Sequence, residues 1–160
     1  MATSLGWFIP CALALAAGGA AAQPHTASCI NSGSSAVEPL DGASGHALQV
    51  VTLTCVHSSG AVDGAVSTLE AIWEVDMASS KLVSAHAVAR KPGALAAYRI
   101  TEGVLQPVMK QGKPAGWTAT GKGVYLVGSG TAASLSGRSF SWMARLTGPR
   151  LYAMDFRLDD

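Results

Sequence analysis

The histidines of this chain are too scattered in sequence to form a known catalytic or metal-binding motif. His25, His46, His57 and His86 form neither an H-x-H pair nor an HExxH array, and no Cys/His spacing suits zinc. We expect His25, His46 and His57 at the surface, because the first precedes the strand-rich region and the other two bracket its first strand. His86 lies in mid-strand, where it could act as a general base inside the fold or occupy the outside of the strand. The sequence therefore assigns no catalytic residue, no metal and no cofactor.

Carboxylates and glycine-rich loops give no stronger catalytic signal. Glu70 and Glu74 share the polar face of one expected strand, and a solvated sheet face explains them. Glu102 precedes Gly103 between two apolar runs, so we expect a turn there, with an acid at the mouth of a barrel as the alternative. Residues 128–131 (GSGT) lack the spacing of a G-x-S-x-G nucleophile elbow, and their glycines are typical of a hairpin loop.

The aromatic residues are the most informative set. Trp73, Trp117 and Trp142 fall on three different expected strands, in a chain whose other apolar residues are mostly Ala, Val and Leu. They either fill the core or line a cavity beside small residues such as Ala85 and Ala87. The ligand-binding residues that the sequence suggests are Trp73, Trp117, Trp142, Tyr98, His86, Arg90 and Glu102.

Residues 1–22 have the composition of a secretory signal peptide. An apolar run from Trp7 to Ala17 is followed by three alanines at 20–22, which form an A-x-A cleavage pattern before Gln23. The run is shorter than the roughly 17–25 residues of a spanning helix. We expect cleavage and export to the periplasm or the extracellular space, with no membrane span in the mature chain.

Cleavage would remove Cys11 and leave two cysteines, Cys29 and Cys55. Two cysteines in an exported chain predict one disulfide, and the absence of a CxxC motif makes that bridge structural. The bridge would tie a Ser/Gly-rich leader, residues 23–45, onto the domain at 46–160. In the chain-entropy model it stabilises the fold by about 3 kcal/mol.

From position 46 onward, short apolar runs alternate with turn residues. In the run 67–77, Leu69, Trp73 and Val75 form one face while Glu70 and Glu74 lie on the other, which is the period of a half-buried strand. The expected strands span 46–57, 67–77, 81–91, 95–101, 104–110, 116–127, 138–147 and 150–158. Connections this short join only antiparallel neighbours. The sequence therefore predicts an all-β fold, an antiparallel up-and-down barrel of about eight strands, with a β-sandwich as the alternative.

Residues 121–140, GKGVYLVGSGTAASLSGRSF, end one expected strand in a Gly-x-Gly-Thr-Ala loop and lead through Leu135-Ser136-Gly137 into the next. Together with the meander of eight strands, this segment resembles the barrel shared by allene oxide cyclases and dirigent proteins. The resemblance implies a barrel cavity for a small apolar molecule, and oligomers, commonly trimers, built through the barrel exteriors. No catalytic motif of either family is matched, so the resemblance assigns no catalytic residue.

The charge composition limits the class of partner. Eleven Lys and Arg residues against ten Asp and Glu residues give a net charge of +1, and only 13% of residues are charged. This balance argues against a nucleic-acid-binding protein. It also leaves little repulsion between copies, so we expect a homo-oligomer, with cover by loops or the leader as the alternative.

We therefore expect an exported small β-barrel that binds a small apolar molecule or a protein partner without catalysis. The alternatives are a cyclase or isomerase that acts inside the barrel, and a structural protein associated with the cell envelope. An ionisable group inside the barrel beside the tryptophans would favour catalysis, and the candidates are His86, Arg90, Arg99 and Glu102. A solid interior would favour the structural role.

Overall fold

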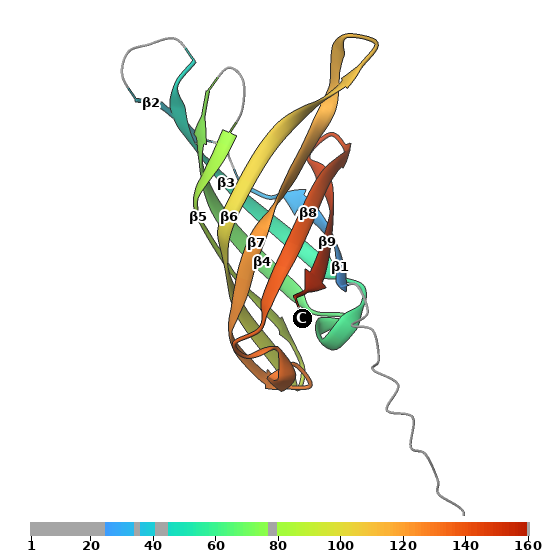
Figure 1. Ribbon diagram of the computed structural model, residues 1–160. Helices are drawn as coiled ribbons and strands as arrows, with labels where there is room; N and C mark the ends of the chain where they lie inside the picture. The colour runs from blue at the N-terminus through green and yellow to red at the C-terminus, as the bar shows by residue number, and fades with distance from the viewer. Residues whose placement is uncertain (1–24, 34–35, 41–44, 77–79, 160) are drawn as a thin grey trace, which may run out of the picture.

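The computed structural model describes residues 25–33, 36–40, 45–76 and 80–159, and most of them lie in antiparallel strands (Figure 1). Two short 3-10 turns, η1 (Gly60–Val62) and η2 (Ala133–Leu135), each contribute one buried residue to the core. The strands are β1 (His25–Asn31), β2 (Ala36–Pro39), β3 (Ala47–His57), β4 (Val66–Val75), β5 (Ser80–Lys91), β6 (Ala94–Lys110), β7 (Lys113–Gly130), β8 (Ser139–Gly148) and β9 (Leu151–Leu158).

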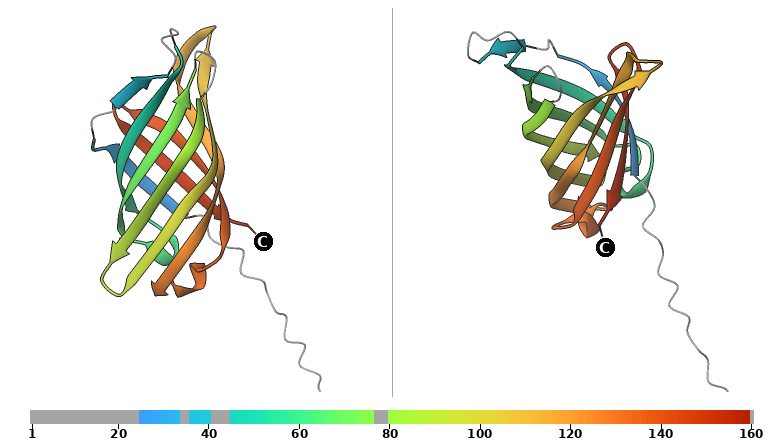
Figure 2. Two further views of the ribbon diagram at one scale, coloured as in Figure 1. Left: turned by 90° about the vertical axis from the view of Figure 1, so that its left-hand side faces the viewer. Right: turned by 45° about the horizontal axis from the view of Figure 1, so that its top comes forward.

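Eight of these strands form a closed antiparallel barrel. From β3 to β9 each strand pairs with the next one along the chain, and β1 pairs with both β3 and β9, which closes the ring (Figure 2). β2 pairs with β3 and lies outside this closure. The predicted up-and-down barrel is confirmed, and the sandwich is excluded. Closure gives each barrel strand a partner on both sides, so the ring has no open edge.

One of the eight barrel strands replaces two that we expected. We expected separate strands at 95–101 and 104–110 with a turn at Glu102-Gly103, but β6 runs without interruption from Ala94 to Lys110. Its register against β7 shifts between Ile100 and Glu102, and Glu102 is exposed on the outside. The prediction of a turn was wrong because Gly103 serves packing: a Cβ there would lie 3.1 Å from Trp142 Cζ2 and 3.2 Å from Trp73 Cη2.

The remaining strand, β1, comes from the segment that we expected to be a leader. It pairs with β9 from His25 opposite Phe156 to Ile30 opposite Leu151, and with β3 on its other side. Alternate side chains of β1 are buried, starting at His25, so the segment has the period of a half-buried strand. The barrel therefore begins at His25. The expected signal peptide, residues 1–22, lies outside the described part of the chain.

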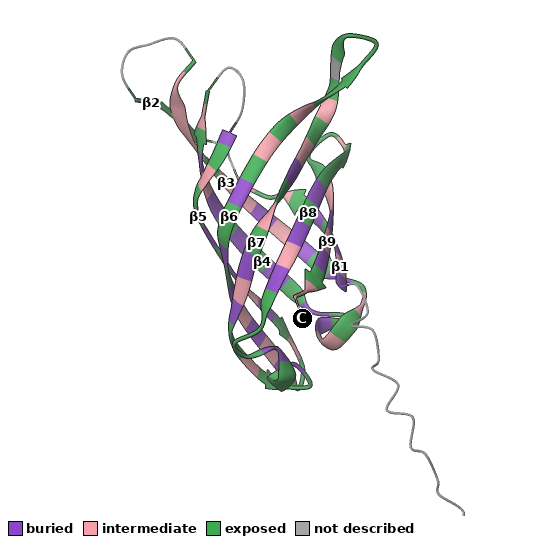
Figure 3. Ribbon diagram, viewed as in Figure 1, coloured by how far each residue is buried: buried purple, intermediate pink, exposed green. Residues whose placement is uncertain are grey.

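The alternation predicted for β4 is confirmed. Leu69 and Trp73 are buried and Val75 is half-buried, while Glu70 and Glu74 are exposed on the other face. Figure 3 shows buried and exposed residues in alternating bands along the barrel strands. A strand cannot turn both sets inward, because successive side chains point to opposite faces of the sheet. This alternation fixes which side of every neighbouring strand faces the barrel interior.

On β5, a bulge brings side chains of both sequence parities inside. Ala85 and Ala87 are buried and His86 is exposed between them. The β4–β5 register shifts between Ile72 and Trp73, so that Leu82 also faces the interior although it lies an even number of residues from His86. Ala85, Ala87 and Ala89 are all buried and form a row of small side chains on the inner wall.

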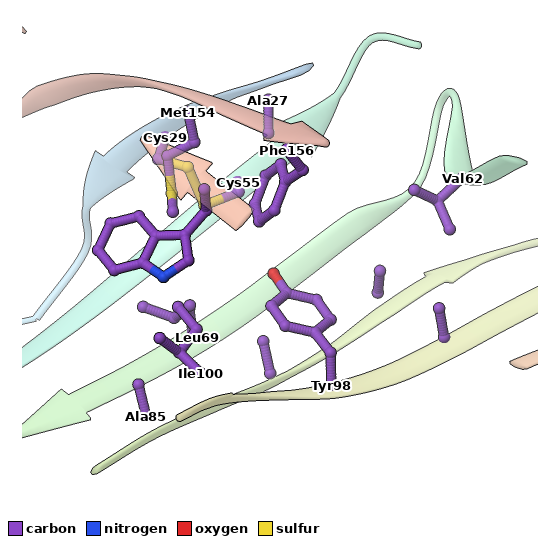
Figure 4. Close-up of a cluster of buried hydrophobic side chains, with 14 of the residues drawn as sticks. Ala27, Cys29, Cys55, Val62, Leu69, Ala85, Tyr98, Ile100, Met154 and Phe156 are labelled. Carbon is purple, nitrogen blue, oxygen red and sulfur yellow. A yellow bond between two sulfur atoms is a disulfide. The ribbon is translucent and has the colours of Figure 1, made fainter. Parts of the chain in front are cut away.

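Cys29 and Cys55 form the predicted disulfide. They lie opposite each other in the β1–β3 register with their Cα atoms 4.0 Å apart, and both are buried. Figure 4 shows the bridge inside the barrel, close to Met154 and Phe156. It therefore joins two neighbouring barrel strands beside the seam where β1 meets β9.

Candidate ligand-binding site

One half of the barrel interior is filled by aromatic rings. The four residues called here the aromatic layer, Tyr98, Tyr125, Phe140 and Phe156, are all buried. The ring centroids of five of their pairs lie between 4.8 and 6.1 Å apart, and these five pairs meet edge-on or tilted, which is the arrangement that aromatic rings favour. Gly123 makes the layer compact, because a Cβ there would overlap the Phe140 ring.

The other half of the interior contains a cavity of about 140 Å³. Every barrel strand contributes at least one side chain to its wall, and most of these side chains are apolar. The lining residues are Asn31, Gln49, Val51, Leu53, Leu69, Ala71, Trp73, Leu82, Ala85, Ile100, Leu105, Ala119, Trp142, Ala144, Tyr152 and Met154.

Two tryptophans form one part of the cavity wall. Trp73 of β4 and Trp142 of β8 are buried, and the nearby Gly103 leaves space for both rings. The indole Nε1 of Trp142 donates a hydrogen bond to the backbone oxygen of Glu102 at 3.3 Å. The polar atom of this tryptophan is thereby satisfied within the wall, and the ring presents an apolar surface to the cavity.

Small side chains account for the empty space. Ala71 and Ala85 are direct cross-strand partners on β4 and β5, and Ala119 and Ala144 are partners on β7 and β8. All four line the cavity. An engineered apolar cavity of about 150 Å³ in another protein binds benzene or xenon. The cavity here is therefore close in volume to one that holds a single benzene molecule.

The polar residues of the cavity lie at its rim. Asn31, Gln49 and Tyr152 line it and are half-buried, whereas Leu69 and Ile100 on the wall are buried. Half-exposed lining residues mark the side from which solvent or a ligand reaches the cavity. Such a rim can orient a ligand by hydrogen bonds while the interior selects for apolar surface.

A buried chain of hydrogen bonds runs beside the aromatic layer. The Tyr125 hydroxyl lies 3.0 Å from His25 Nδ1, His25 Nε2 lies 2.7 Å from His57 Nδ1, and His57 Nε2 lies 2.9 Å from Ser67 Oγ. Each neutral imidazole has one donor and one acceptor, so the whole chain can be satisfied when both histidines are neutral. The His25 ring also stacks on Phe156, with centroids 4.8 Å apart.

Burial keeps the ionisable groups of these hydrogen bonds, and of the nearby Tyr98, in their neutral forms. Desolvation, with a smaller repulsion from His57, lowers the pKa of His25 to about 3, and desolvation lowers the pKa of His57 to about 4. Burial raises the pKa of Tyr98 to about 12 and also raises the pKa of Tyr125. All four groups are therefore neutral near pH 7. Tyr125, His25 and His57 are hydrogen-bonded in a row, Tyr98 is hydrogen-bonded to Ser67, and none of the four lines the cavity.

The expectation that His25 and His57 lie at the surface was wrong. They are 8% and 1% exposed, because β1 is a barrel strand, so that His25 on β1 and His57 on the neighbouring β3 both point into the barrel. His46 is only half-buried, and its Nε2 lies 2.8 Å from Glu74 Oε1.

The structure brings together only some of the residues that the sequence suggested as ligand contacts. Trp73 and Trp142 line the cavity, and Tyr98 belongs to the aromatic layer below it. His86, Arg90 and Glu102 are exposed on the outside of the barrel, and Trp117 is exposed because it lies on the part of β7 that extends past β8. Outward positions on a closed barrel cannot contact a ligand held inside it.

Several cavity residues were missed by reading the sequence. Ala119 and Ala144 lie on strands whose parity could be read, but only the barrel register makes them partners. Asn31 was assigned to the leader, and Tyr152 was not among the residues suggested as ligand contacts. The local signal at Asn31 is weak, because only Ala27, Ser28 and Cys29 alternate between apolar and polar, and Asn31 continues the parity of the two apolar residues.

Comparison of the chain with models of protein families, with curated proteins and with solved structures finds no match. These comparisons give no support to the resemblance to allene oxide cyclases and dirigent proteins that was drawn from residues 121–140. Within the described residues, no helix has the length and apolar character to cross a membrane, and no three His, Cys, Asp or Glu side chains are grouped to hold a metal ion.

Proposed function

We propose that this protein binds a small apolar molecule, of about the size of one aromatic ring, inside the barrel. The observation that supports this most directly is the cavity of about 140 Å³ walled by Trp73, Trp142 and four alanines. A barrel of eight strands has space for either a packed core or one small ligand. Here one half of the interior is packed and the other half is hollow.

Binding is favoured over acid–base catalysis. The four ionisable residues that were candidates for chemistry inside the barrel, His86, Arg90, Arg99 and Glu102, are all exposed on the outside. The described cavity lining contains no histidine, lysine, arginine or carboxylate. A cyclase or isomerase that worked here would have only Asn31, Gln49 and Tyr152 as polar groups.

Export to the periplasm or the extracellular space is part of the proposal. The signal-like residues 1–22 and the buried disulfide between Cys29 and Cys55 support it, because disulfides persist in oxidising compartments. Cell fractionation followed by intact-mass measurement tests it. We expect a chain that begins at Gln23 and weighs 2 Da less than its reduced form, since one disulfide removes two hydrogens. Recovery of the full-length chain in the cytosol with free thiols would contradict export.

Titration with benzene, followed by calorimetry and by the intrinsic tryptophan fluorescence, tests ligand binding. We expect saturable binding at one site. The variant Ala85→Leu places a larger side chain in the cavity and should abolish binding, and Ala144→Leu serves as a second filling variant if the first does not fold. Val83→Leu is the matched control, because Val83 lies on the same strand but is 57% exposed. Absence of benzene binding, or equal binding by Ala85→Leu, would reject a cavity of this kind.

A further inference from the structure

The distribution of charge along the chain is strongly uneven, although the net charge is only +1. All eleven Lys and Arg residues follow Ser80, and no Asp or Glu lies between Glu102 and Asp155. That acid-free stretch contains the last part of β6 and all of β7 and β8. The turn between β6 and β7 therefore carries Lys110 and Lys113 without a carboxylate of its own, whereas on the barrel wall Lys122 lies opposite Glu102 and Arg145 is paired with Asp155.

The hairpin of β6 and β7 projects beyond the barrel. β5 pairs with β6 as far as Leu105, and β8 pairs with β7 as far as Thr118. Residues 106–117, called here the projecting hairpin, therefore pair among themselves and with the base of the same hairpin, and with no other described strand. Figure 1 shows this hairpin rising well past the ends of β8 and β9.

The projecting hairpin combines exposed apolar side chains with positive charge. Val108, Met109 and Trp117 are 44%, 56% and 45% exposed. Lys110 and Lys113 flank the turn at its end, where they are exposed and paired in the β6–β7 register. Tryptophan is enriched where protein meets the membrane–water interface, and basic residues beside it are attracted by anionic lipid headgroups.

The hairpin stands at the cavity end of the barrel. Leu105 and Ala119 are cross-strand partners directly below it, and both line the cavity. The half-exposed rim residues Asn31 and Tyr152 lie at the end of β1 and the start of β9, which is the same end of the barrel. A surface held by the hairpin would therefore face the cavity rim.

We propose that the projecting hairpin docks the protein on an anionic lipid surface, with Trp117, Val108 and Met109 entering the interface and Lys110 and Lys113 contacting headgroups. One part of this inference rests on the proposed function, namely that the cavity takes its apolar ligand from the lipid surface. The docking itself depends only on the hairpin.

A lipid surface explains the hairpin better than a second copy of the chain. A second copy would have to offer the lysines an acidic face, and its best candidates are Glu70 and Glu74 on the outside of β4. Both carboxylates already face histidines: Glu74 lies 2.8 Å from His46 and Glu70 lies 3.5 Å from His86. An anionic bilayer supplies unpaired negative charge and apolar depth together.

Co-sedimentation with vesicles, without any cavity ligand, tests docking. We expect binding to vesicles of phosphatidylcholine with phosphatidylglycerol, weakening at high salt, and little binding to phosphatidylcholine alone. Neutralising each lysine should weaken binding about fivefold, and K110Q/K113Q together about 25-fold. The control R90Q/R99Q removes the same charge from exposed positions on the barrel wall and should bind nearly as well as the unaltered protein.

Brominated lipid should quench the fluorescence of Trp117, so that the W117F variant loses this quenching.

Three outcomes would overturn the proposal. They are equal binding to both kinds of vesicle, equal loss in K110Q/K113Q and R90Q/R99Q, and sedimentation that occurs without vesicles, which would assign the hairpin to self-association. The Ala85→Leu variant separates this proposal from the proposed function, because filling the cavity should leave vesicle binding unchanged.

Discussion

His25 Nε2 lies 2.7 Å from His57 Nδ1 inside the barrel, and the two residues come from neighbouring strands, β1 and β3. One of the two nitrogens must be unprotonated for this contact to be a hydrogen bond. If both rings were protonated, two N–H groups would face each other in a site that also excludes water. The pair therefore links the stability of the barrel to pH.

We expect the free energy of unfolding to fall as the pH falls below about 6.5, the ordinary pKa of histidine. In the folded state the pKa values are about 3 for His25 and about 4 for His57, so the unfolded chain binds protons that the folded chain does not. Each histidine then costs about 1.4 kcal/mol per pH unit between pH 6.5 and its folded pKa, and nothing above pH 7. Urea unfolding at pH 7.5, 6.0 and 5.0 measures this slope.

Histidine variants identify the source of that slope. His57→Gln should reduce the slope to about half, because His25 still contributes, whereas His86→Gln should leave it unchanged, because His86 is exposed beside Glu70. An unchanged slope in the His57→Gln protein would show that other groups control the acid sensitivity.

Two glycine variants test how tightly the aromatic layer is packed. Gly123→Ala places a Cβ against the Phe140 ring and 2.8 Å from the backbone oxygen of Arg99, so we expect a loss of about 1–3 kcal/mol or more. Gly148→Ala is the control, because its Cβ would meet only Leu151 at 3.4 Å or beyond, and should change stability by less than about 0.5 kcal/mol. Chemical denaturation of both variants measures the difference. Equal stabilities would contradict the close contact.

Enlarging two alanines on the same face of β5 should have different effects on stability. Ala85 lines the cavity, whereas Ala87 lies between its cross-strand partners Leu69 and Tyr98 and is not among the lining residues. We expect Ala85→Leu to fold with nearly unchanged stability and Ala87→Leu to lose about 1–3 kcal/mol from overpacking. Thermal melts of the two variants compare them. Similar losses in both would show that the barrel interior is solid throughout.

The disulfide gives a prediction about both reactivity and stability. Cys29 and Cys55 are 3% and 1% exposed, so mild reductant should leave the bridge intact in the folded protein and reduce it after addition of denaturant. The bridge closes a loop with a sequence separation of 26, and its removal in C29A/C55A should cost about 3 kcal/mol. Thiol titration with and without urea, together with urea unfolding, checks both points. Rapid reduction under native conditions would contradict the buried position.

The sequence was sufficient for the fold class but not for the boundaries of every strand. Period-two alternation in β4 predicted the inward side of Trp73 correctly, because burial on one face of a sheet leaves a local signal. It failed at Gly103, since a glycine that accommodates distant tryptophan rings looks the same in sequence as a turn glycine. It also failed at His25, whose burial depends on pairing with β9 at the far end of the chain.

The candidate site was less predictable than the fold. Trp73 and Trp142 could be suggested from their size and strand positions, but the exposure of Trp117 depends on how far the hairpin extends past β5 and β8. Self-association stays a prediction, to be measured by light scattering at micromolar concentration. The exposed Val104 and Met143 on the outer wall are residues that it would cover.

The pairing of β1 with β9 has a consequence for biosynthesis. During synthesis β1 is made before β9, and the ring cannot close until both strands are present. Until β9 is available, β1 and β8 both present open edges on which another chain could add a strand. The bond between Cys29 and Cys55 needs only the first 55 residues, so it can hold β1 against β3 during that interval. A chain truncated before β9 should therefore oxidise normally and yet aggregate.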